Sequence, residues 1–165
     1  MTKTLKFLGM VIVCVAVAAL FFKFMKGYPP IETDAFEWEK TVKVYFVDRA
    51  KLETSSCEAD VALERRVINA ETLGPGAIEA LLKGLSETEK ETYLSAIGPD
   101  VLLQNFEIRD RVAYVDFSSS FNEGLGGSCN VVALRSQVEK TLTVLPDIDA
   151  VVISVDGETE GILEP

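Results

Sequence analysis

The residues that most resemble a reaction centre stand in one short run, where Asp116 is followed by Ser118, Ser119 and Ser120. A serine becomes a nucleophile only when a neighbouring base activates it. The chain contains no histidine, and nothing in the sequence fixes a lysine beside this run. Hydroxyl and carboxylate groups at the end of a strand also bind the backbone of the loop that follows. The sequence favours that structural role, and we expect no catalytic residue.

A glycine-rich loop over residues 124–128 precedes a long expected helix, an arrangement that can bind phosphate. The loop lacks the Gly-Lys-Ser/Thr ending of a nucleotide-binding loop, and no lysine is within reach in the sequence. Glycines allow the positive φ that a tight helix entry needs, and Ser128 can cap the helix. The sequence therefore favours a helix entry over a phosphate site.

The chain offers no recognisable set of metal ligands. It has three cysteines, far apart and without a Cys-x-x-Cys pair, and no histidine. Its acidic clusters, over residues 87–91 and 158–164, do not have the spacing of an EF-hand. A solvated acidic surface accounts for them, and we expect neither a metal nor a cofactor.

Charge is divided unevenly along the 165 residues. The first 26 residues hold four of the 16 basic residues and none of the 26 acidic ones, so the remainder carries a net charge of −14. Such a surface repels nucleic-acid phosphates and anionic lipid headgroups. We therefore exclude nucleic acid as a partner.

Residues 7–22 form an uncharged apolar run between pairs of lysines. The run is slightly short of the ~20 residues that span a bilayer, but flanking lysines can extend toward the headgroups. Two alternatives remain open: an uncleaved signal anchor over residues 1–26, or a signal peptide cleaved near Ala16-Val17-Ala18. We favour the anchor, because cleavage there would leave an apolar end on the mature chain. Residues 7–22 would then lie in the membrane, residues 27–40 would form an acidic linker, and the C-terminal part would lie outside the cytoplasm.

After the linker, the spacing of apolar residues predicts an α+β domain. Strands are expected at 41–47, 61–68, 101–108, 112–118 and 149–155, and helices at 78–85 and 128–145. The order β-β-α-β-β-α-β suggests a two-layer fold, with both helices on one face of a mixed, mostly antiparallel sheet. Charges in the middle of 61–68 predict an edge strand with one wet face. Ser86 and Glu89 have the spacing of a capping box and indicate a further short helical turn.

Six short motifs follow one another along the chain: VYF at 44–46, IEALLKG at 78–84, SAI at 95–97, VDFSSSF at 115–121, TLT at 141–143 and VDG at 155–157. In this order they resemble the GerMN domain of sporulation and spore-germination proteins, over residues 41–158. Residues 159–165 are then an acidic tail. The most characteristic of these motifs supplies Asp116, Ser118, Ser119 and Phe121. The sequence departs from the family at Leu85 and Gly98, where proline is common.

This resemblance implies an extracytoplasmic module of bacterial envelope proteins, with a fold similar to the ring-building motif of secretion and sporulation channels. It implies binding or assembly rather than catalysis, with envelope proteins or further copies of the chain as partners. We expect the partner surface at Arg65 and Arg66, whose positive charges stand out on an acidic domain. The alternative is an envelope protein that binds or modifies peptidoglycan.

The two cysteines outside the apolar run are Cys57 and Cys129. In an oxidising compartment we expect them to form a disulfide. Two separate thiols, with Cys129 buried at the start of a helix, are the alternative.

Overall fold

The computed structural model describes residues 17, 20, 21, 23, 39–52, 57, 59–68 and 72–164. The chain divides into two compact units, Met1–Phe36 and Glu37–Pro165. The predicted anchor and linker lie largely outside the described residues. Those of the first unit that are described are helical: Val17, Leu20, Phe21 and Lys23. None of the described helices is long and apolar enough to cross a membrane.

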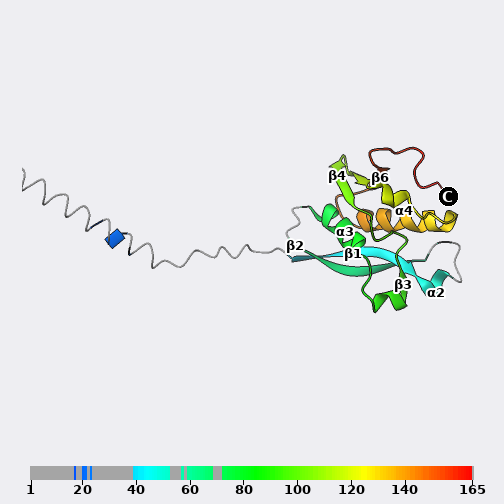
Figure 1. Cartoon of the computed structure of the whole chain (residues 1–165), viewed down its shortest axis with the longest axis horizontal. Helices are drawn as coiled ribbons and strands as arrows, with labels where there is room; N and C mark the ends of the chain where they lie inside the picture. Colours follow the sequence, from blue (N-terminus) through cyan, green and yellow to red (C-terminus); the bar gives the residue numbers. More distant parts are fainter. Residues whose placement is uncertain are drawn as a thin grey trace, which may run out of the picture. The chain divides into compact units, whose positions relative to one another are not determined.

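Two three-stranded sheets form the frame of the second unit (Figure 1). The first has the strand order β2-β1-β3, and the second has the order β4-β5-β6. The strands are β1 (Glu39–Asp48), β2 (Asp60–Ile68), β3 (Tyr93–Leu94), β4 (Leu103–Arg109), β5 (Val112–Phe117) and β6 (Ala150–Val155). All neighbours pair antiparallel except β5 and β6, which are parallel and are connected through helix α4 (Ser128–Thr143).

The helices α3 (Leu73–Leu82) and α4 lie between the two sheets and contact strands of both (Figure 1). The apolar stripe predicted on α4 is buried, with Leu134, Val138 and Leu142 all within one core. Alternate residues of β1 and β5 point into the same core, as a period of two requires. The shorter elements are α2 (Arg49–Leu52) and the 3-10 turns η1 (Glu89–Glu91) and η2 (Ser119–Asn122).

The predicted α+β class and the predicted order of the main elements are confirmed, and the pairing is mixed and mostly antiparallel. The prediction of a single sheet with both helices on one face is wrong. Strand β1 meets β3 only at Val47 and Asp48. Earlier along β1, side chains of α4 occupy this edge instead of a strand. The β4-β5 hairpin therefore extends into a separate sheet with β6.

Both helices begin differently from the prediction. Helix α3 begins at Leu73, five residues before the predicted start, so Gly74-Pro75-Gly76 lies in its first turn, where a proline removes no intrahelical hydrogen bond. Gly74 lets the Phe106 ring approach the helix closely, because an added Cβ atom there would force the ring to shift. At α4 the N-cap is Gly127, with a φ of 89°, so Ser128 is the first helical residue and not the cap.

Candidate interaction surface

Strand β2 forms one edge of its sheet. Its residues pair with β1, from Asp60 opposite Val47 to Ile68 opposite Glu39. Within the described part of the chain, no strand pairs with the other side of β2. Backbone N–H and C=O groups of alternate β2 residues therefore face outward, as the predicted edge position requires.

A groove of about 490 Å³ runs between this edge and α3. Its lining consists of Arg65, Arg66, Val67 and Ile68 from the strand and Gly76, Glu79, Ala80 and Lys83 from the helix. Consecutive strand residues point to opposite faces, so a groove lined by four in succession follows the edge of the strand. The helical residues are three and four apart and form one stripe.

The two arginines predicted as a partner surface occupy different environments. Arg65 is held by the domain: its guanidinium pairs with Glu89 at 2.9 Å and lies 5.5 Å from the centroid of the Phe46 ring. Only 20% of the Arg65 side chain is exposed, whereas Arg66 is 77% exposed. Arg66 pairs with Glu39 at 3.2 Å, and an exposed pair of this kind stabilises a protein by at most about 1 kcal/mol. Arg66 is therefore the arginine that a partner can reach.

Glu89 fixes Arg65 beside the groove. Its carboxylate accepts hydrogen bonds from the Ser86 N–H group at 2.8 Å and from the Ser86 hydroxyl at 2.9 Å. In return, Ser86 Oγ accepts the Glu89 N–H at 3.4 Å, which completes the predicted capping box. The pKa of Glu89 is lowered, chiefly by the hydrogen bond from the Ser86 N–H group. The Ser86 hydroxyl and Arg65 also lower this pKa, while partial burial acts in the opposite direction.

The other edge of this sheet is closed by two buried side chains of α4. The Tyr45 N–H donates to Thr141 Oγ1 at 3.0 Å, and the Tyr45 carbonyl accepts from Gln137 Nε2 at 3.0 Å. Gln137 Oε1 also accepts the Ala96 N–H at 2.7 Å. Both side chains are fully buried, and sequence reasoning missed them. Their i, i+4 spacing beside the apolar stripe is the signal that could have found them.

Two of the motif residues tie the ends of β4, β5 and β6 together. Asp116 Oδ1 accepts from the Ser154 hydroxyl at 2.6 Å and from the Gly157 N–H at 2.8 Å. Ser118 Oγ accepts the Leu102 N–H at 3.0 Å. These bonds satisfy loop backbone and a neighbouring strand, which accounts for the carboxylate and the hydroxyl in structural terms.

The remainder of the motif packs η2 onto the core. Phe121 is buried and stacks on Phe117, with 4.2 Å between ring centroids. Ser119 is exposed. Asn122 Oδ1 accepts the N–H of Leu163 at 2.6 Å, and the Leu163 side chain is buried. The segment predicted as a separate acidic tail thus contributes a residue to the core.

The sequence matches the family described as Germane, sporulation and spore germination, over residues 43–161. The chain belongs to this family. Its GerMN domain is similar to the first GerMN domain of the sporulation protein GerM from Bacillus subtilis, with 21% identity and a TM-score of 0.55, covering 73% of this chain and 85% of that chain. It is also similar to the tandem GerMN domains of that protein, with 24% identity and a TM-score of 0.58, covering 73% of this chain and 40% of that chain. These likenesses show the fold. Among curated proteins, no relative matches the chain.

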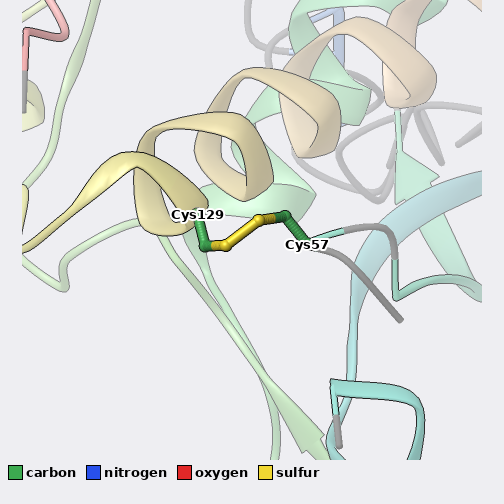
Figure 2. The surroundings of a disulfide bond; sticks show 2 residues. All are labelled: Cys57 and Cys129. Atoms are coloured by element: carbon green, nitrogen blue, oxygen red, sulfur yellow. A yellow bond between two sulfur atoms is a disulfide. The ribbon is translucent and has the colours of Figure 1, made fainter. Parts of the chain in front are cut away.

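In this GerMN domain a disulfide joins Cys57 to Cys129 (Figure 2). It connects the segment before β2 to the first turn of α4. At the start of β2, Asp60 accepts hydrogen bonds from the Ser136 hydroxyl at 2.8 Å and the Lys140 ammonium at 2.6 Å. Two sets of contacts therefore hold the open-edge strand to the helix that closes the other edge.

The described part of the GerMN domain has no cluster of three or more histidine, cysteine or acidic side chains that could hold a metal ion. The loop before α4 serves as a helix entry, where the Gly127 carbonyl accepts the Asn130 N–H at 3.1 Å. The groove along β2 is the candidate surface for a protein partner.

Proposed function

We propose that the chain is a membrane-anchored, non-catalytic module of the bacterial envelope, whose GerMN domain lies outside the cytoplasm and docks a protein partner along β2. The partner is another envelope protein or a further copy of the chain. The family description, sporulation and spore germination, supports a role for this module in the envelope during one of those processes.

The observation that carries the proposal is the groove between an open strand edge and a helix. An extended peptide can add to such an edge, where main-chain hydrogen bonds supply affinity and adjoining hollows supply specificity. Gly76 and Ala80 leave room on the helical side, and Ile68, 56% exposed, offers an apolar contact at the end of the strand. A partner strand would pair with outward-facing backbone groups of β2, although the Glu64 carbonyl already accepts a hydrogen bond from Arg65 Nη1 at 3.0 Å.

The charge of the groove favours an acidic partner segment. The groove is lined by three basic residues and one acidic residue, Glu79. Arg65 is already held by Glu89, so Arg66 and Lys83 are the charges left for a partner. Charges at the border of an interface mainly steer association and select the partner, while the strand edge would supply most of the affinity.

The membrane placement rests on residues 7–22, whose apolar run is flanked by lysines. The side of the membrane rests on the acidic domain and on the disulfide between Cys57 and Cys129, since such bonds persist in oxidising compartments.

Site-specific crosslinking in native membranes tests the proposal. The full-length protein would carry a photoreactive amino acid in place of Arg66, and a matched variant would carry it in place of Asn105. Asn105 is exposed on β4, which is also an edge strand, but of the other sheet. We expect defined crosslinked envelope proteins, or a ladder of the chain's own multimers, from position 66 and not from position 105.

Equal crosslinking from both positions, or none from either, would contradict docking along β2. Sedimentation with purified cell wall tests the alternative of peptidoglycan binding. If the protein sediments with the wall and forms no protein crosslinks, that alternative replaces the proposal.

A further inference from the structure

A second hollow, of about 450 Å³, lies at the C-terminal end of α3 and shares the lining residue Lys83 with the β2 groove. Its wall comes mainly from residues 82–85, 93–95 and 97–99. Two of the family motifs, one ending at Gly84 and the other at Ile97, meet here. Neither the partner surface nor the motif contacts described above account for this hollow.

The hollow is lined by basic residues, although the domain as a whole is acidic. Arg49, Lys83 and Lys90 are among its lining residues, and none of the described lining residues is acidic. Beyond residue 26, by contrast, the chain has 26 acidic residues and only 12 basic ones. A concave, partly apolar site strengthens the attraction of such a set for an anion, because less water screens it.

The three cations differ in how firmly they are held. Arg49 Nε donates to the Lys90 carbonyl at 3.2 Å, which fixes the guanidinium beside the hollow. Lys90 Nζ pairs with Glu87 at 2.7 Å, but both side chains are more than half exposed, so the pair is weak. The Lys83 ammonium has no hydrogen bond or ion pair with any described residue.

The rest of the wall is mostly apolar. Its apolar and aromatic lining residues are Leu82, Leu85, Tyr93, Ile97 and Pro99. The space stays open at Gly98, where an added Cβ atom would meet no heavy atom within 4 Å. Pockets of a few hundred cubic ångströms with an apolar wall and a few charged groups are typical of sites for small ligands.

We propose that this hollow binds a carboxylate carried on a small apolar body. Lys83 and Arg49 would hold the carboxylate through charge-assisted hydrogen bonds, while the leucine and isoleucine side chains cover the apolar part. Of the residues that line the β2 groove, only Lys83 also lines this hollow. The two sites therefore share one cation, while Arg49 and the apolar wall belong to this hollow and not to the β2 groove.

The test is titration of the full-length protein, in a neutral detergent, with N-acetyl-leucine, followed by NMR of the backbone amides. N-acetyl-leucinamide has the same shape without the charge and serves as the control ligand. We expect saturable shifts at Gly84, Ser95 and Gly98 with the acid, and none with the amide.

A second ligand distinguishes the source of the carboxylate. A capped Leu-Glu-Leu peptide carries its only carboxylate on a side chain, as an internal segment of a protein would. Saturation by the free acid indicates a small molecule. Saturation by the peptide alone indicates a protein segment. If neither ligand saturates these amides, or if the amide ligand binds equally well, the inference is wrong.

Three variants locate the binding within the molecule. Gly98→Leu fills the hollow without a backbone conformation that disfavours a side chain, and should abolish the shifts. Lys83→Gln should weaken binding about three- to fivefold, as expected for one exposed charge. Arg66→Gln removes the same charge from the β2 groove alone and should leave binding unchanged. Unaltered binding in Gly98→Leu would overturn the assignment to this hollow, whatever the fate of partner docking along β2.

Discussion

The two edges of the sheet β2-β1-β3 differ in whether other parts of the domain hydrogen-bond to their backbone. On the β1 side, Gln137 and Thr141 hydrogen-bond both backbone groups of Tyr45, and β3 pairs with the last two residues of the strand. On the β2 side, no described strand pairs with the edge, which borders a groove, and the bond from Arg65 Nη1 to the Glu64 carbonyl joins two residues of β2 itself. A backbone group can remain unpaired by protein only where water or a partner reaches it. The domain thus closes one edge of the sheet with its own side chains and leaves the other edge unpaired among the described residues, which is the edge that the proposed function assigns to a partner.

Breaking the Cys57–Cys129 disulfide should have the largest effect, because it links the two edges through β2 and α4. The cysteines are 72 residues apart, and closing a loop of that length stabilises a fold by about 4 kcal/mol in the chain-entropy model. The Cys57→Ser/Cys129→Ser variant should lose about that much free energy of unfolding in a denaturant titration.

Thiol titration of the denatured protein checks the bond itself. One free thiol, from Cys14, is expected without reductant, and three are expected with it. Three thiols in protein that was never reduced would show that the cysteines do not pair in solution.

Opening the closed edge should have the next largest effect. Gln137→Leu keeps the volume of the side chain but leaves the Tyr45 carbonyl and the Ala96 N–H buried without partners, at a cost of about 3 kcal/mol. Thr141→Val leaves only the Tyr45 N–H unpaired and should cost about 1–2 kcal/mol.

Gln104→Leu is the matched control for these substitutions. Gln104 is exposed and bonds the side chain of Asp156, so its loss should change the free energy of unfolding by less than about 0.5 kcal/mol. Equal destabilisation by the substitutions at 104 and 137 would show that the buried contacts do not close the edge.

This closed edge also marks where sequence reasoning succeeds and where it stops. The apolar stripe of Leu134, Val138 and Leu142 repeats at helical spacing, so periodicity alone predicts the buried face of α4. Gln137 and Thr141 lie beside this stripe at i, i+4 spacing, which signals a position near the buried face but does not identify the groups that they bind. Both side chains bind the backbone of Tyr45, which is more than ninety positions away in the sequence. Local periodicity contains no information about a contact between such distant residues.

The same limit applies to the sheet and to the candidate site. The alternation of apolar and polar residues identifies each long strand. The assignment of β1 and β5 to separate sheets depends instead on which strand edges meet in space. The charges of β2 predict an edge, and the edge is there. The sequence could not distinguish Arg65 from Arg66, because the contrast between them comes from Glu89 and from the Phe46 ring.

Charge reversal at Arg65 and at Arg66 tests separately whether each arginine serves stability or partner binding at the open edge. Arg66→Glu should reduce the affinity for an acidic partner about fivefold or more, because a repulsion replaces an attraction, and should barely change stability. Arg65→Glu places two carboxylates together at Glu89 and should lower the free energy of unfolding by about 1–2 kcal/mol. Partner binding that survives Arg66→Glu unchanged would show that the open edge is not the docking surface.

The smallest effect is expected from Glu89, which holds Arg65 in place at this edge. Its pKa is lowered from 4.5 in the folded protein, chiefly by the hydrogen bond from the Ser86 N–H. A lowered folded pKa contributes stability that is fully present well above the unfolded value and is lost as the pH falls through the folded value. Glu89→Gln should therefore be less stable than the native chain at pH 7, by less than about 1 kcal/mol, with a smaller difference at acid pH. Glu91→Gln, on the same turn, controls for the loss of one negative charge. A difference between the native chain and Glu89→Gln that stays constant from pH 7 down into the acid range would mean that the ionised carboxylate does not hold Arg65, and that the contrast between the two arginines has another origin.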